Sequence, residues 1–169
     1  ELGGTHGGST QTAFQLIAIA SAAGADAVKF QKRDNDTLYA KALLDKAYDN
    51  DYSYGPTYGA HRAALEFDAE QYQAIWRTAS QHSITAFATA FDEASADFLM
   101  QFDCPALKVH SGGLTDLALL HHVASYDVPI LLSTGGGTIE DIDRAHDALS
   151  NVPHAILHCT ASYPLKPEE

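Results

Sequence analysis

Short runs of aliphatic and β-branched residues alternate with longer stretches of helical spacing along the whole chain, and this alternation most constrains the fold. It is typical of an α/β protein with parallel strands. The predicted strands cover residues 25–30, 84–88, 106–110, 129–133 and 155–159, with the tail of an earlier strand at Glu1 and Leu2. The last four strands end at Thr89, Ser111, Thr134 and Cys159, a spacing of 22 to 25 residues. This period indicates consecutive βα units of a (β/α)8 TIM barrel, with a doubly wound sheet as the alternative.

A barrel of this type typically needs about 250 residues, and the chain has 169. We therefore expect an incomplete barrel domain over residues 1–169, with about six of eight strands and truncated at both ends. A long insert, residues 31–67, follows the strand predicted at 25–30 and is rich in Tyr, Asp and Gly. Because loops of this length are usually functional, we expect the insert over the mouth of the barrel.

Helix start and stop signals lie between the predicted strands. Asp68 with Gln71 forms a capping box, flanked by Phe67 and Tyr72 as a hydrophobic staple, and Thr138 with Asp141 repeats the capping box. The run STGGGT at 133–138 joins a strand to the second of these helices. It lacks the GxGxxG spacing and the Walker lysine, so it indicates a tight βα turn rather than a nucleotide loop.

Charge and cysteine content exclude several classes of partner. The 22 acidic and 10 basic residues give a formal net charge of -12, which argues against nucleic acid or an anionic membrane as a partner. No run approaches the roughly 20 apolar residues of a membrane span. Two cysteines, Cys104 and Cys159, indicate reduced thiols in a cytoplasmic protein rather than a disulfide framework.

Two lysines stand at equivalent depths of two predicted strands, Lys29 and Lys108, with the hydroxyls of Thr89 and Ser111 between them. An unpaired buried ammonium is costly, so this set favours a pocket for a phosphate or a carboxylate. Either lysine alone would more commonly extend to solvent. A Schiff-base lysine, as in an aldolase, is a second interpretation. Lys32 and Arg33 could serve a second phosphate, although a solvated loop is the more common role for such residues.

Several segments in series resemble the sialic acid synthase family, which comprises the N-acetylneuraminate synthases and their 9-phosphate-forming relatives. The segments are ELGGTHGG, GADAVKFQKRDN, SYGPTYGAHRAALEF, FATAFDEASADFL, CPALKVHSGGLTD, PILLSTGGGT and HCTASYPLKPEE. The resemblance implies a TIM-barrel transferase of sialic acid biosynthesis that condenses phosphoenolpyruvate with N-acetylmannosamine, or its 6-phosphate, and releases phosphate. It implies catalytic roles for Glu1, Lys29 and Lys108. It also implies contacts of Lys29, Thr89, Lys108 and Ser111 with phosphoenolpyruvate, and of Glu1, Gln31 and Tyr163 with the N-acetylhexosamine.

The resemblance further implies a homodimer of the whole protein and a divalent metal, Mn or Mg, held by histidines on strands 7 and 8. We expect no metal ligand set in this chain and no tight metal binding by it. Gly113 stands where the family usually has an acidic residue close to the reacting carbons. Because the histidines implied for the metal, and the C-terminal domain of the family, lie beyond Glu169, we expect the isolated chain to be inactive. The remaining alternative is a non-catalytic relative that binds the anion or the sugar without consuming it.

Overall fold

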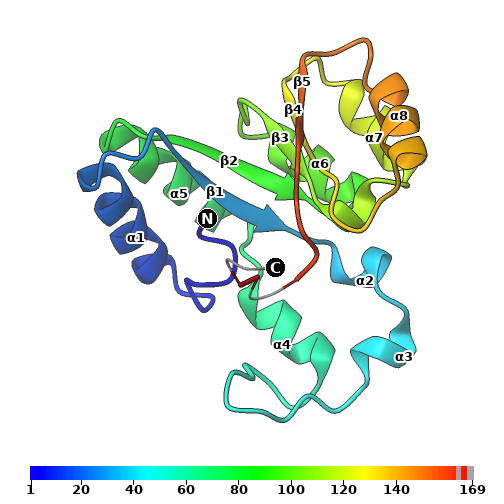
Figure 1. The fold of residues 1–169 in the computed structure, drawn as a ribbon. Helices are drawn as coiled ribbons and strands as arrows, with labels where there is room; N and C mark the ends of the chain where they lie inside the picture. The colour runs from blue at the N-terminus through cyan, green and yellow to red at the C-terminus, as the bar shows by residue number, and fades with distance from the viewer. Residues whose placement is uncertain (163–164, 167–169) are drawn as a thin grey trace. The chain divides into compact units, whose positions relative to one another are not determined.

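A computed structural model describes residues 1–162 and 165–166 of the chain. The chain divides into two compact units, Glu1–Cys104 and Pro105–Glu169, and each is described by itself. Both units consist of parallel strands joined by helices, so both are α/β in character (Figure 1).

The first unit contains two parallel strands, β1 (Ala27–Lys32) and β2 (Thr85–Ala90). Successive side chains of a strand point to opposite faces. Val28 and Phe30 are buried on one face, and the Phe30 ring lies 6.3 Å from that of Trp76. Lys29 and Gln31 therefore share the other face, together with Thr89, the register partner of Gln31 on β2.

Five helices of the first unit begin at side-chain caps, and three of them pack beside the strands. Helix α1 (Thr10–Ala22) follows Ser9, α5 (Ala69–Gln81) follows Asp68, and α6 (Glu93–Met100) follows Asp92. The capping box of Asp68 and Gln71 is present, and the Phe67 and Tyr72 rings lie 6.3 Å apart as a staple. Figure 1 shows α1 and α5 packed along β1 and β2.

The insert between β1 and β2 is built of short helices, α2 (Asn35–Leu38), α3 (Lys41–Leu44) and α4 (Tyr58–Leu65). An isolated antiparallel bridge joins Ala47 to Thr57 and closes the loop between α3 and α4. In Figure 1 these helices lie beyond the carboxyl end of β1. An aromatic cluster of Tyr39, Tyr48, Tyr54, Tyr58 and His61 packs the insert together.

The second unit contains β3 (Leu107–Val109), β4 (Ile130–Ser133) and β5 (His154–Leu157), paired in chain order and all parallel. A short 3-10 turn, η1 (Ser111–Gly113), follows β3. Helices α7 (Leu117–Ala124) and α8 (Ile139–Ala148) complete the unit, and α8 begins at the predicted capping box of Thr138 and Asp141. The core consists of buried aliphatic side chains, chiefly Leu107, Val109, Leu114, Leu119, Leu120, Val123, Ile130, Leu132 and Leu149.

All five complete strands of the sequence prediction are confirmed, with ends displaced by up to two residues. The prediction of a strand at Glu1 and Leu2 is wrong for the described residues, because this segment forms no strand and its main chain bonds to β1 from Leu2 N to Lys29 O at 2.8 Å. The insert was predicted as a loop, and its helices are a correction. Its location over a barrel mouth stays a prediction.

Candidate functional site

Lys29 is the first of the two strand-end lysines, and its ammonium group already has two partners. Nζ donates a hydrogen bond to Thr89 Oγ1 at 3.0 Å and forms an ion pair with Glu1. The Lys29 side chain is 13% exposed and Thr89 is buried. An ammonium group has three N–H donors, so the third can meet a further acceptor.

The strand register explains how Lys29 reaches Thr89. Lys29 pairs with Phe87, and Thr89 stands two residues further along β2. Residues two apart on a strand lie on the same face. The long lysine side chain therefore extends past its register partner, toward the carboxyl end of the next strand.

Lys108 repeats this geometry in the second unit. It pairs with Leu131, and its Nζ donates to the Oγ of Ser133, two residues further along β4, at 2.5 Å. Ser133 is buried, as Thr89 is. Two lysines thus form the same arrangement, each bonded to a buried hydroxyl at the end of the neighbouring strand.

Ser111 lies beside Lys108 in the sequence but contacts the glycine turn instead. Its Oγ accepts a hydrogen bond from the backbone N–H of Gly135 at 3.1 Å. Gly136 has a φ of +80° and Gly137 N bonds to Thr134 O, so this segment is the predicted tight turn between β4 and α8. A Cβ on Gly137 would lie 2.1 Å from Leu114 Cδ2, which explains a glycine at that position.

A polar network extends from Lys29 across the end of β1. Gln31 Nε2 donates to Glu1 Oε1 at 3.2 Å, and Gln31 Oε1 accepts from Arg33 Nη2 at 2.6 Å. Glu66, from the insert, accepts from Lys32 Nζ at 3.2 Å and from the Arg33 backbone N–H at 3.1 Å. Neither cation is solvated as the sequence suggested, because their side chains are only 14% and 11% exposed and Glu66 holds both.

Gly113 is buried at the end of η1, close to the second lysine in sequence. A Cβ at this position would lie 2.8 Å from Val109 Cγ1, which is closer than carbon atoms approach without one of them moving. The local packing therefore fits a residue without a side chain, and an acidic residue here needs Val109 to move.

The structure places the predicted site residues in two groups. Glu1, Lys29, Gln31 and Thr89 are bonded to one another in the first unit. Lys108 and Ser111 both contact the end of β4 in the second unit, through Ser133 and Gly135. Their assembly into one pocket stays a prediction, and Tyr163 lies outside the described residues.

Sequence reasoning had not assigned Ser133 as the partner of Lys108 or Arg33 as the partner of Gln31. Ser133 was visible as a polar strand end, and the pairing of β3 with β4 identifies it as the hydroxyl that Lys108 reaches. No sequence signal separated Arg33 from an exposed loop cation, because its burial depends on Phe91 and Glu66, which are distant in sequence.

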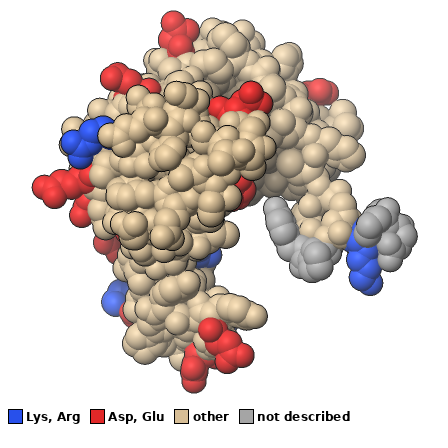
Figure 2. Space-filling view, turned by 90° about the vertical axis from the view of Figure 1, so that its left-hand side faces the viewer, with Lys and Arg blue, Asp and Glu red and all other residues tan. Residues whose placement is uncertain are grey.

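The face drawn in Figure 2 carries scattered acidic side chains and few, separate basic ones. Anion binding would therefore depend on local cations such as Lys29 and Lys108 rather than on a positive surface. Within residues 1–162 and 165–166, no three or more His, Cys, Asp or Glu side chains are grouped to hold a metal ion. In the same residues no helix has the length and apolar character needed to cross a membrane.

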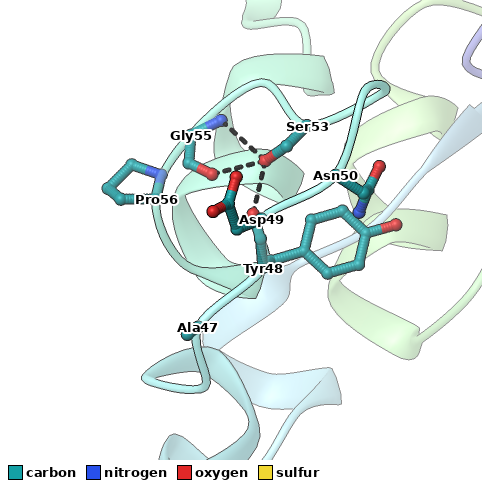
Figure 3. Close-up of a pocket in the computed structure, with 7 residues that line it drawn as sticks. All are labelled: Ala47, Tyr48, Asp49, Asn50, Ser53, Gly55 and Pro56. Atoms are coloured by element: carbon teal, nitrogen blue, oxygen red, sulfur yellow. Dashed lines mark hydrogen bonds between the residues drawn. The ribbon is translucent and has the colours of Figure 1, made fainter.

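The insert also contains an open pocket of about 620 Å³, lined by residues 47–50, 53, 55 and 56. Figure 3 shows the Ser53 hydroxyl at the centre of the turn, within 2.6 Å of the Tyr48 carbonyl oxygen and 2.5 Å of that of Gly55. These bonds hold the loop in shape. None of the predicted site residues lines this open pocket.

Comparison with known proteins identifies the family. The model of the NeuB family matches residues 16–169. The chain belongs to the NeuB family. It is 33% identical over 172 residues to an N-acetylneuraminate-9-phosphate synthase of Drosophila melanogaster, covering 100% of the chain and 46% of the relative. It is 34% identical over 174 residues to an N,N'-diacetyllegionaminic acid synthase of Legionella pneumophila, covering 97% of the chain and 48% of the relative.

A solved structure shows the same fold. The N-acetylneuraminic acid synthetase of Leptospira borgpetersenii, in complex with citrate, superimposes with a TM-score of 0.83 at 25% identity, covering 98% of the chain and 54% of the synthetase. The chain is therefore part of a TIM-barrel α/β fold, and the barrel prediction is confirmed. The chain spans about half the length of the curated relatives it matches.

Proposed function

We propose that the whole protein condenses phosphoenolpyruvate with N-acetylmannosamine, or its 6-phosphate, and releases inorganic phosphate. The observation that carries the proposal is the repeated pair of a strand-end lysine and a buried hydroxyl, Lys29 with Thr89 and Lys108 with Ser133. Phosphoenolpyruvate carries a phosphate and a carboxylate, so it suits a site with two such cations. The family supports the proposal, because the Drosophila and Legionella relatives are synthases of nonulosonic acids.

The reaction joins C3 of phosphoenolpyruvate to the aldehyde carbon of the sugar. Water adds to C2, and the bond from C2 to the phosphate oxygen breaks as phosphate leaves. Lys29, Thr89, Lys108 and Ser111 would hold the phosphate and carboxylate through charge-assisted and neutral hydrogen bonds. We add Ser133 to this proposed set, because it is already bonded to Lys108.

Glu1 and Gln31 would contact the sugar, together with Tyr163. The Glu1 carboxylate accepts hydrogen bonds and the Gln31 amide donates them, a combination that suits sugar hydroxyls. Glu1 also pairs with Lys29. An entering anion therefore shares the ammonium group with Glu1, and the charge of Glu1 limits how tightly phosphoenolpyruvate binds before the sugar arrives.

The resemblance also implies a divalent metal, Mn or Mg. The described residues supply no ligand set for it, so the steps above use only side chains of this chain. The metal, a homodimer and a cytoplasmic location stay predictions for the whole protein.

The decisive experiment measures phosphate release by the full-length protein with phosphoenolpyruvate, manganese and either N-acetylmannosamine or its 6-phosphate. Lys29→Met and Lys108→Met should each lower the rate by about 100-fold or more, a loss typical of removing one preorganised group that stabilises developing charge. Lys41→Met is the matched control, because Lys41 is 86% exposed and its ion pair is with Asp45, away from the predicted site residues. Unchanged rates in both site variants would refute the proposal.

Two alternatives give different results in the same preparation. A non-catalytic relative would bind phosphoenolpyruvate in a calorimeter and release no phosphate. A Schiff-base aldolase would yield a borohydride-trapped adduct on Lys29 or Lys108. The 169-residue chain alone is expected to release no phosphate, and release by it would contradict that expectation.

A further inference from the structure

We propose that Arg33 is a positioning residue that fixes the side-chain amide of Gln31 and so connects the insert to the sugar side of the site. This inference rests on the proposed function, because that function gives Gln31 a role toward the sugar. The hydrogen bonds around Gln31 carry it.

The amide of Gln31 has a defined orientation because its two ends meet opposite partners. Its oxygen accepts a hydrogen bond from Arg33 Nη2 at 2.6 Å, and its nitrogen donates to Glu1 Oε1 at 3.2 Å. A guanidinium group only donates and a carboxylate only accepts. If the amide were turned over, its N–H donors would face the Arg33 donor and its oxygen would face the Glu1 carboxylate. Both contacts would be repulsive, so one orientation is favoured.

The backbone of Gln31 is also held. Its carbonyl oxygen accepts a hydrogen bond from the Tyr72 hydroxyl at 2.8 Å, and Tyr72 is fully buried in α5. Gln31 is paired with Thr89 in the register of β1 and β2. Strand pairing thus fixes the main chain, and Arg33 and Glu1 fix the amide at the end of the side chain.

Arg33 is itself immobilised, which a positioning residue requires. Its guanidinium stacks on the Phe91 ring at 3.6 Å and lies 3.8 Å from Glu66, with 11% of the side chain exposed. Burial lowers the pKa of Arg33, and the positive charge of Arg62 lowers it further. An arginine nevertheless remains protonated in proteins, so it stays a donor to Gln31 at every pH of interest.

Glu66 makes the connection to the insert. It follows α4 directly, and it binds the Arg33 side chain and backbone N–H. The chain of contacts runs from α4 through Glu66, Arg33 and Gln31 to Glu1. A change in the insert can therefore reach the sugar side of the site without touching the lysines.

Lys32 provides a matched control. It binds the same Glu66 carboxylate through Oε2, while the Arg33 guanidinium lies nearest Oε1. The Lys32 side chain is 14% exposed, and its ammonium lies 4.9 Å from the Phe98 ring. No described contact joins it to Gln31. Removing Lys32 therefore perturbs the same carboxylate and a similar amount of buried surface, but leaves the amide held.

The first test uses steady-state kinetics of the full-length protein. Arg33→Met should raise the KM for the sugar by about 10- to 100-fold, the loss typical of one hydrogen bond to a charged group, with the KM for phosphoenolpyruvate unchanged. Lys32→Met should change neither value by more than about twofold. In a Gln31→Ala background, Arg33→Met should have no further effect, because the group it positions is gone.

The second test does not depend on turnover. In the 15N-labelled full-length protein, Arg33→Met should shift the side-chain amide resonances of Gln31 and increase their exchange with water, and Lys32→Met should leave them in place. Arg33→Lys keeps a donor near Gln31 and serves if the methionine variant does not fold; it should restore the amide resonances in part.

The outcomes separate this inference from the proposed function. Equal effects of Arg33→Met and Lys32→Met, or an effect of Arg33→Met that persists without Gln31, would overturn the inference. Absence of turnover in every variant, with the amide resonances still responding to Arg33→Met, would refute the proposed function and leave the positioning role of Arg33 intact.

Discussion

Gly113 and Val109 form a contact whose energy can be worked from the structure. A Cβ on Gly113 would lie 2.8 Å from Val109 Cγ1, and Val109 is completely buried. Carbon atoms normally pack at about 3.5–4.0 Å, and a valine side chain has little rotational freedom to move aside. Overpacking of this size costs about 1–3 kcal/mol. Gly113 does not have a left-handed backbone, so its main chain can accept an alanine without strain. Alanine also lowers the conformational entropy of the unfolded chain, which stabilises the folded state by about 0.4–1 kcal/mol and offsets part of the overpacking cost.

Gly113→Ala should therefore destabilise the second unit by about 1–2 kcal/mol. Val109→Ala removes two buried methyl groups and should cost about 2–3 kcal/mol, from lost transfer energy and the cavity left behind. The double variant should be more stable than the sum of the two by about 1–3 kcal/mol, because the new Cβ fills space that Cγ1 has left.

Urea denaturation followed by far-UV circular dichroism measures these free energies of unfolding. The single tryptophan, Trp76, lies in α5 of the first unit, so its fluorescence reports on a part of the chain that the substitutions do not touch. Additive losses, or a Gly113→Ala variant as stable as the parent, would refute the packing argument. The same contact predicts that Gly113→Asp lowers the free energy of unfolding less in a Val109→Ala background than in the parent chain.

Three further predictions concern the first unit. Glu1→Gln should tighten phosphoenolpyruvate binding by up to about fivefold in calorimetry, because the Glu1 side chain is 49% exposed and such an ion pair with Lys29 is worth about 1 kcal/mol or less; weaker binding would contradict this. Burial lowers the pKa of His6, whose Nδ1 accepts the Gly8 N–H at 3.0 Å, so the unfolded state binds the proton more readily. The free energy of unfolding should then fall as the pH drops below about 6.5, and in His6→Asn, which keeps an acceptor, thermal melts should show a smaller fall. Gly8→Ala should destabilise the unit far more than Gly24→Ala, although both glycines have positive φ. A Cβ added at Gly8 would lie 2.0 Å from the backbone oxygen of Ala64, whereas one added at Gly24 meets nothing within 4 Å. Similar urea midpoints for the two variants would contradict this.

The strands and the capped helices could be predicted because their signals are local. Ser9, Asp68 and Thr138 each cap a helix through bonds to residues within three positions. The strand ends were less predictable. The apolar run that identifies β1 ends at Phe30, but pairing with β2 continues to Lys32, because main-chain bonds do not depend on side-chain polarity.

The insert and part of the site depend on contacts between distant segments, which sequence patterns do not record. Helix α4 is short and is held by a cluster of aromatic rings rather than by its own periodicity. Arg33 resembles a solvated cation in the sequence and becomes buried through Phe91 and Glu66. Tertiary packing therefore overrode the local interpretation at the residues that connect the insert to the site.

The two lysines show how a site residue can be derived once a strand register is known. In each unit the lysine bonds not to the residue opposite it but to a hydroxyl two positions further along the next strand. Parallel strands present residues of one face at every second position, and a lysine is long enough to span that step. The sequence placed the hydroxyls of Thr89 and Ser111 between the two lysines and did not say which hydroxyl Lys108 contacts. The register assigns Ser133, and the same rule that links Lys29 to Thr89 makes Ser133 the stronger candidate to share an anion with Lys108.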